Sequence, residues 1–183
     1  MWDSLDSLVP LSALVWVFPI IFLIHDGEEL LTQPRWKQII QSRPARLARR
    51  RWLWRPWMQL FDIPRSRLAA AVAFIFAIVV IVTLRTISAL RAGENLRLFT
   101  IVVTMLLLNA FTHIVHALLT RRCPPGAATS VLVLLPYCAY TLHRLSLSGK
   151  GMATIDGHVL GLAAIALLAT VAAAHLFARI VAP

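Results

Sequence analysis

The amino-acid sequence predicts an all-α fold, a polytopic membrane bundle of about five transmembrane helices. Of its 183 residues, 59% are hydrophobic and 14% are charged, and the mean hydropathy is +0.76. Soluble domains are roughly half apolar and one quarter charged. In addition, five separate stretches are long and apolar enough to cross a bilayer core of about 30 Å. We therefore interpret residues 1–183 as a single membrane domain.

The predicted spans are apolar stretches of about the length that a bilayer requires. They lie approximately at residues 8–25, 68–90, 98–119, 127–142 and 158–178. Asp3 and Asp6 precede the first span, where a cleavable signal peptide would carry positive charge. We therefore expect the first span to be retained. The fourth span follows the turn Pro125-Gly126, and Thr129 lies in its first turn.

Residues 34–64 form the one long region predicted not to span the membrane. Prolines interrupt it, and tryptophans alternate with most of the arginines. Tryptophan favours the headgroup level and arginine favours anionic phosphates, so we expect an amphipathic interfacial segment that contacts anionic membrane lipids. The simplest role is a membrane anchor, and a more specific one is a lid over the residues that precede it.

The distribution of basic residues predicts an orientation. If the N-terminus is outside and the spans alternate, thirteen of the 18 Lys and Arg residues fall on one side and five on the other. The positive-inside rule assigns the larger group to the cytoplasm. We expect a multi-pass protein of the cell (inner) membrane, with its N-terminus outside and its C-terminus cytoplasmic. The net charge of +10 then requires no nucleic-acid partner.

The pentad His25-Asp26-Gly27-Glu28-Glu29 directly follows the first apolar stretch. On a helix, His25, Glu28 and Glu29 project from one face because they are spaced by three and four residues. Such a cluster is costly near lipid and indicates a functional site. Asp26 lies beside this face, so we expect it to be solvated or to cap the end of the helix.

The predicted orientation brings polar residues of other spans to the level of the pentad. Asn109, His113 and His116 share one face of the third span, at its cytoplasmic end. Thr129 begins the fourth span, and His175 lies near the cytoplasmic end of the fifth. The residues expected at this one depth are His25, Glu28, Glu29, Asn109, His113, His116, Thr129 and His175.

These residues resemble the signature of the HXXEE-motif membrane proteins, a family of small polytopic proteins of poorly defined function. The matching positions are His25-x-x-Glu28-Glu29, Asn109-x-x-x-His113 and Pro125-Gly126-x-x-Thr129. Cys123 occupies a position at which the family pattern has tyrosine. The resemblance covers about residues 8–129 and supports the choice of site residues, but it implies no particular reaction.

Imidazole and carboxylate groups together suit a divalent transition metal, here zinc, iron or manganese, as one or two ions. The candidate metal ligands are His25, Glu28, Glu29, His113, His116 and His175. The candidate catalytic residues are Glu28, Glu29, Asn109 and Thr129. A glutamate that is not a ligand could act as general base, and Asn109 could orient a ligand histidine or donate to an oxyanion.

Two classes of function follow from this chemistry. The first is a metal-dependent membrane enzyme acting on an apolar or lipid-like substrate, by hydrolysis or, with two metals, by oxidation; hydrolysis is weakly favoured because histidines are few. The second is a carrier of metal ions or protons that uses the same cluster. A membrane assembly or lipid-binding protein without chemistry would leave the acidic residues unexplained. The oligomeric state does not follow from the sequence.

Overall fold

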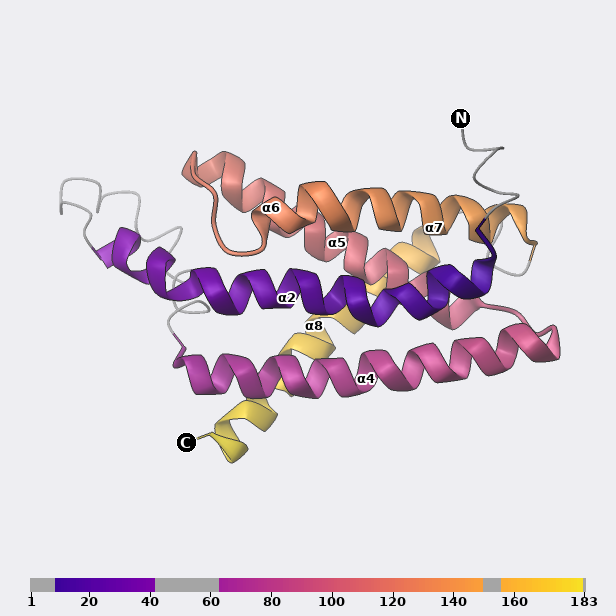
Figure 1. Cartoon of the computed structure of the whole chain (residues 1–183), viewed down its shortest axis with the longest axis horizontal. Helices are drawn as coiled ribbons and strands as arrows, with labels where there is room; N and C mark the ends of the chain where they lie inside the picture. Colours follow the sequence, from indigo (N-terminus) through magenta and orange to yellow (C-terminus); the bar gives the residue numbers. More distant parts are fainter. Residues whose placement is uncertain (1–8, 42–62, 150–155, 183) are drawn as a thin grey trace.

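The computed structural model describes residues 9–41, 63–149 and 156–182. Within these ranges all the regular structure is helical, which confirms the predicted all-α fold. The elements, shown in Figure 1, are α2 (Leu11–Gln41), α4 (Arg65–Ala92), α5 (Arg97–Thr120), α6 (Ala127–Thr129), the π-helical η2 (Ser130–Leu134), α7 (Leu135–Leu147) and α8 (Gly157–Val181).

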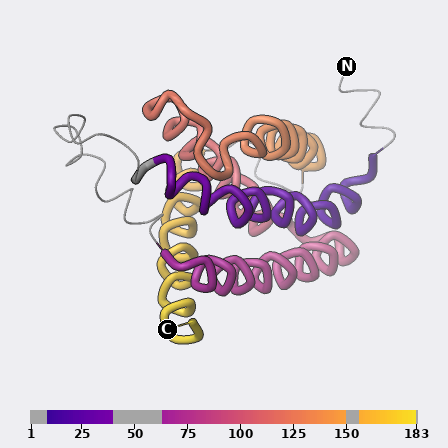
Figure 2. The backbone as a smooth tube through the Cα atoms, turned by 60° about the vertical axis from the view of Figure 1, so that its left-hand side comes forward, coloured from indigo at the N-terminus to yellow at the C-terminus, as the bar shows by residue number. Residues whose placement is uncertain are grey.

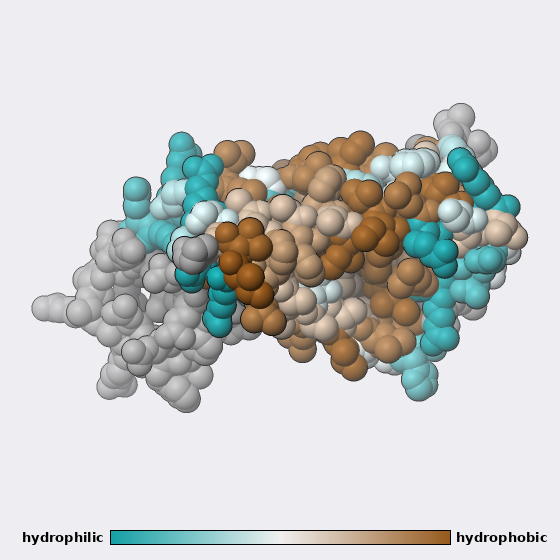
Figure 3. Space-filling model, turned by 90° about the horizontal axis from the view of Figure 1, so that it is seen from below, coloured by the Kyte–Doolittle hydropathy of each residue, from teal (hydrophilic) through white to brown (hydrophobic). Residues whose placement is uncertain are grey.

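Four of these helices are long and apolar enough to cross a membrane, namely α2 over Leu11–Ile39, α4, α5 and α8. The fourth predicted span corresponds to α6, η2 and α7, which follow one another without a gap. Together they extend for roughly 30 Å at the rise of a helix. Figure 3 shows an apolar belt around the middle of the molecule, with hydrophilic residues at both ends. This surface is that of a small membrane protein.

The helices α2, α4, α5 and α7 lie roughly along one direction, while α8 crosses them steeply and packs against α4 and α5 (Figures 1 and 2). Phe18 of α2 is fully buried at the centre. Its ring meets Phe99 edge-on, with centroids 5.6 Å apart, and stacks on Tyr137, with centroids 6.4 Å apart. The Tyr137 hydroxyl donates to the Leu14 carbonyl at 2.9 Å. These contacts fix α2 against both α5 and α7.

The expectation that the first helix ends near the pentad is wrong, since α2 continues through Pro34 to Gln41. A proline inside a helix removes one backbone hydrogen bond and usually ends or kinks the helix. Here side chains on both sides of Pro34 stabilise the continuation, because Gln33 Nε2 and Lys37 Nζ both donate to the Ile63 carbonyl, at 3.3 and 2.6 Å. The pentad therefore lies within a helix, and Asp26 caps no helix end.

The predicted interfacial segment falls into two parts. Its first residues, Pro34 to Gln41, are the last part of α2. Residues 42–62 lie outside the described residues, so the anchor and lid hypotheses for that region stay predictions. The chain returns at Ile63, and α4 begins at Arg65, beside the end of α2 (Figure 1).

Candidate metal centre

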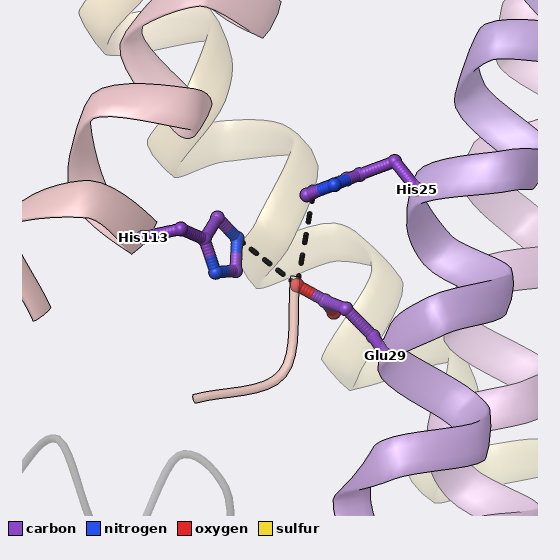
Figure 4. Close-up of side chains that lie close together, drawn as sticks. All are labelled: His25, Glu29 and His113. Carbon is purple, nitrogen blue, oxygen red and sulfur yellow. Dashed lines mark ion pairs between the residues drawn. The ribbon is translucent and has the colours of Figure 1, made fainter. Parts of the chain in front are cut away.

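Two histidines and one glutamate meet between α2 and α5. His25 and Glu29 lie one turn apart on α2, and His113 approaches from α5 (Figure 4). Both imidazoles are buried, and Glu29 is mostly buried. Their placement follows from the sequence, because residues four apart on a helix point the same way.

The three side chains are close enough to hold one ion. Glu29 Oε1 lies 3.0 Å from His113 Nε2 and 3.8 Å from His25 Nε2, and the three ligand atoms all lie within 4.8 Å of one another. Ligands bound at 2.0–2.2 Å to a tetrahedral zinc ion are themselves roughly 3.3–3.6 Å apart. A single metal ion therefore fits among these atoms with small side-chain movements.

The orientation of His113 is fixed by the backbone before α6. Its Nδ1 lies 3.0 Å from the Pro125 carbonyl oxygen. A carbonyl can only accept a hydrogen bond, so the proton of the ring is on Nδ1. In the neutral ring, Nε2 then presents a lone pair to Glu29. Metal-binding histidines commonly use this arrangement, in which the second nitrogen donates to a carbonyl.

A chain of hydrogen bonds fixes His25 in the same way. Glu28 Oε2 accepts from the Thr129 hydroxyl at 2.6 Å and from the Thr129 backbone N–H at 2.9 Å. Since the hydroxyl proton is used by Glu28, His25 Nδ1, at 2.8 Å from Thr129 Oγ1, must be the donor. Its Nε2 is therefore also unprotonated in the neutral ring and faces Glu29.

The three ligand atoms consequently bring lone pairs together. With both Nδ1 protons committed, His25 Nε2 and His113 Nε2 face the Glu29 carboxylate without a hydrogen between them. The His25 lone pair, 3.8 Å from Glu29, is also reached by the Asn109 amide, but the His113 and Glu29 lone pairs lie 3.0 Å apart, which is unfavourable in a buried place unless a cation lies between them. That cation is either a metal ion or an additional proton.

Gly126 lies against this centre. Its φ of +78° is the left-handed conformation that favours glycine, and a Cβ added there would lie 2.7 Å from Glu29 Oε1 and 2.8 Å from His113 Cε1. The turn before α6 can therefore approach the two ligands only without a side chain at this position. The same turn supplies the Pro125 carbonyl to His113.

A cavity of about 200 Å³ opens beside the centre, between α2, α4, α5 and α8. Asp26, Glu29 and Gln33 line it from one face of α2, and Asn109 and His113 line it from α5. Asn109 Nδ2 lies 3.3 Å from His25 Nε2, so its amide reaches the lone pair of a ligand nitrogen. The centre is thus accessible from a cavity, with an amide and a second carboxylate in the wall.

Six of the eight predicted site residues come together in the structure, namely His25, Glu28, Glu29, Asn109, His113 and Thr129. The other two lie outside the group of three ligand atoms. The His116 ring contacts Trp36 edge-on, with centroids 5.7 Å apart, and His175 lines the cavity from α8. Glu28 and Thr129 bind each other and orient His25, whereas Glu29 faces both imidazoles.

Two contributors to the site were not among the predicted site residues. The Pro125 carbonyl is a backbone group and carries no sequence signal of its own. Asp26 was expected to be solvated, but it is buried and lines the cavity. Its spacing from Glu29 and Gln33, three and seven residues, is a helical face. That pattern, read past residue 25 as far as Gln33, would have indicated both that the helix continues beyond the pentad and that Asp26 lies in the wall.

Comparison with known proteins identifies one family. Residues 16–141, more than half of the chain, match the family described as "protein of unknown function with HXXEE motif". No curated protein and no solved structure matches the chain. The matched region includes every residue of the centre, from His25 to Thr129. The chain therefore belongs to the family of HXXEE-motif membrane proteins.

Proposed function

We propose that the protein is a membrane metalloenzyme that uses one divalent transition metal ion, held by His25, Glu29 and His113, to hydrolyse an apolar substrate. One observation carries this proposal: both histidines have their Nδ1 proton committed, so three lone pairs converge at one point. Two histidines and one glutamate are also the ligand set of several catalytic zinc sites, which keep a position open for water or substrate.

The bound metal would act as a Lewis acid and lower the pKa of a bound water molecule to about 7. The residues of the chain then have separate tasks. The Asn109 amide, beside the ligands and in the cavity wall, is placed to donate to a developing oxyanion. Asp26 is the cavity carboxylate outside the ligand group, and we assign it the role of general base.

Hydrogen bonding favours one metal over two. A dinuclear site would require Glu28 as a further ligand, but its Oε2 accepts two hydrogen bonds from Thr129. Glu28 therefore acts through Thr129 on the orientation of His25. Two histidines and one carboxylate also occur in mononuclear iron oxygenases. Metal identity distinguishes the two chemistries, since zinc supports hydrolysis and iron supports oxidation.

The distribution of basic residues supports a position of the site in the cytoplasmic leaflet. The ends of α2, α5 and α8 and the starts of α4 and α6 lie at one end of the bundle (Figure 1). The described basic residues there are Arg35, Lys37, Arg65, Arg67, Arg121, Arg122 and Arg179. We propose that this end faces the cytoplasm of a cell membrane and contacts anionic lipids.

The alternative function is a metal-ion or proton carrier. It predicts polar side chains that continue through the other half of the bundle. Thr83, Thr86, Thr100 and Thr104 are buried there, but each hydroxyl donates to a carbonyl of its own helix at 2.7 to 3.2 Å. Thr141 of α7 is also buried. Since four of these five hydroxyls already donate within their own helices, the enzyme is the better-supported function. Flux into liposomes that depends on Glu29 would reverse this order.

Elemental analysis of the purified protein tests the proposal. We expect about one zinc, iron or manganese ion per chain in the wild type and a loss of metal in Glu29→Gln, which keeps the shape but removes the charge. Glu94→Gln is the matched control, since Glu94 is exposed in the turn between α4 and α5. Absence of a stoichiometric metal from wild-type protein purified without chelators, and also after incubation with each metal, would contradict the proposal.

A further inference from the structure

The cavity beside the metal centre continues away from it along the bundle axis. The apolar lining away from the centre includes Phe18, Phe22, Val72, Ile75, Val79 and Leu106, and α8 adds Leu167, Val171 and Ala174. On α2 the lining extends from Glu29 back to Phe18, and on α4 it extends from Leu68 to Val79. Eleven residues of helix correspond to roughly 16 Å. The cavity is therefore elongated, polar at one end and apolar along its length.

The volume of the cavity limits what the arm can hold. About 200 Å³ is less than the roughly 300–1,000 Å³ of pockets that enclose drug-sized ligands. Distributed over the length of the arm, this volume leaves a narrow channel. Phe18 and Phe22 of α2 and Val72 and Val79 of α4 are buried core residues, and Val79 is 4% exposed. Such a channel suits one unbranched hydrocarbon chain and excludes the paired chains of a membrane phospholipid.

The polar end of the cavity suits the reactive group of such a molecule. Asp26, Asn109 and His113 line the cavity there together with Glu29. A carbonyl group at this point would have the Asn109 amide as a donor and the metal centre beside it. The chain beyond the carbonyl would extend between α2 and α4, toward Val79. The polar end followed by the apolar arm thus matches an acyl group, in which a carbonyl is followed by a hydrocarbon chain.

We propose that the substrate is a single-chain acyl ester or amide, bound with its carbonyl at the metal centre and its chain in the apolar arm. This inference rests on the proposed hydrolytic function. In the reaction, water adds its oxygen to the acyl carbon and the bond from that carbon to the ester oxygen or amide nitrogen breaks. The acyl chain leaves as a carboxylic acid, and the other product leaves as an alcohol or amine that takes up the remaining proton.

Binding of two hydroxamates that differ only in chain length tests the arm. Acetohydroxamate and decanohydroxamate both bind metals through the same head group, so the zinc-loaded protein in lipid nanodiscs is titrated with each. Val79→Phe places a ring inside the arm, as in an overpacked core. We expect this variant to bind decanohydroxamate roughly tenfold more weakly than the wild type does, and to bind acetohydroxamate with unchanged affinity. Ala71→Leu, which narrows the same cavity, is a second arm variant.

Ile81→Phe is the matched control, because Ile81 lies on the outer face of α4 with 60% of its surface exposed. Both ligands should bind Ile81→Phe as they bind the wild type. If folded Val79→Phe and Ala71→Leu bind decanohydroxamate as tightly as the wild type does, or lose both ligands equally, the inference is wrong.

Labelling by a ten-carbon fatty amide with a terminal diazirine separates this inference from the proposed function, because it requires no metal. If the protein binds no metal but the peptides that contain Phe18 and Val79 are labelled, the labelling supports the arm and the absence of metal contradicts the metalloenzyme. If the protein binds metal but labelling is confined to outward-facing positions such as Ile81, the metal supports the proposed function and the labelling contradicts the arm.

Discussion

Two pairs of histidines lie toward the same end of the bundle, but one pair alone brings its ring nitrogens close to Glu29. His25 and His113 each donate a proton from Nδ1 to a fixed acceptor, and each directs Nε2 toward Glu29. His116 instead packs against Trp36, and His175 is half-buried in the cavity wall on α8. A shared depth in the membrane is therefore not enough to join a histidine to the group; its ring nitrogen must also lie near Glu29.

The most informative test of this comparison replaces one member of each pair. His113→Ala should reduce metal affinity by more than about 100-fold, since loss of an outer hydrogen-bond partner alone costs 10- to 100-fold. His116→Ala should keep the affinity and stoichiometry of the wild type. Titration of metal-free protein with zinc, followed by calorimetry, measures both. Equal losses in the two variants would mean that depth, and not ring orientation, defines the centre.

A second comparison is between two glycines, Gly126 in the turn before α6 and Gly27 within α2. Gly126→Ala forces a left-handed residue at a cost of about 1–2 kcal/mol and places a methyl group 2.7 Å from Glu29 Oε1. We expect lower thermal stability together with weaker metal binding. Gly27→Ala, for which nothing lies within 4 Å of the new Cβ, should instead stabilise α2 by roughly 0.5–1 kcal/mol. Unchanged metal binding in folded Gly126→Ala would contradict the close approach of this turn to the ligands.

Thr129 tests whether orientation by a hydrogen bond is what distinguishes the ligand pair. Thr129→Val keeps the branched shape but removes the hydroxyl that links Glu28 to His25, so zinc affinity should fall by about 10- to 100-fold. Thr129→Ser keeps the hydroxyl and should recover most of the affinity. A Ser variant as weak as the Val variant would show that packing of the methyl group, and not the hydrogen bond, is what matters.

The sequence predicts the fold and the close neighbours in this site for clear physical reasons. Long apolar stretches indicate the helices, and residues three or four apart share a face, which brings His25 and Glu29 together. The alternation of spans and the positive-inside rule predict a direction for each span, and this prediction puts Asn109, His113 and Thr129 at the level of the pentad. These inferences depend only on periodicity and charge.

The remaining features depend on tertiary structure, which periodicity does not encode. The helix continues through Pro34 because Gln33 and Lys37 contact Ile63, a residue distant in the sequence. His175 shares the expected depth, but α8 crosses the other helices steeply, and its ring reaches the cavity wall without joining the group of ligand atoms (Figure 2). The acceptor for His113 is a backbone carbonyl, which any residue at position 125 would offer.

The smallest expected effect concerns Glu28, and it decides between one metal and two. Glu28→Gln keeps an oxygen that can accept from Thr129 but removes its charge. A hydrogen bond to a charged group is worth about 1 kcal/mol more than one between neutral groups, so metal affinity should fall only several-fold. The stoichiometry should stay at one ion per chain. If Glu28 is itself a ligand, Glu28→Gln will instead lose metal as completely as His113→Ala does, and the wild type will hold two ions. Elemental analysis of the two variants beside the wild type therefore separates a carboxylate that orients His25 from one that bridges a dinuclear centre.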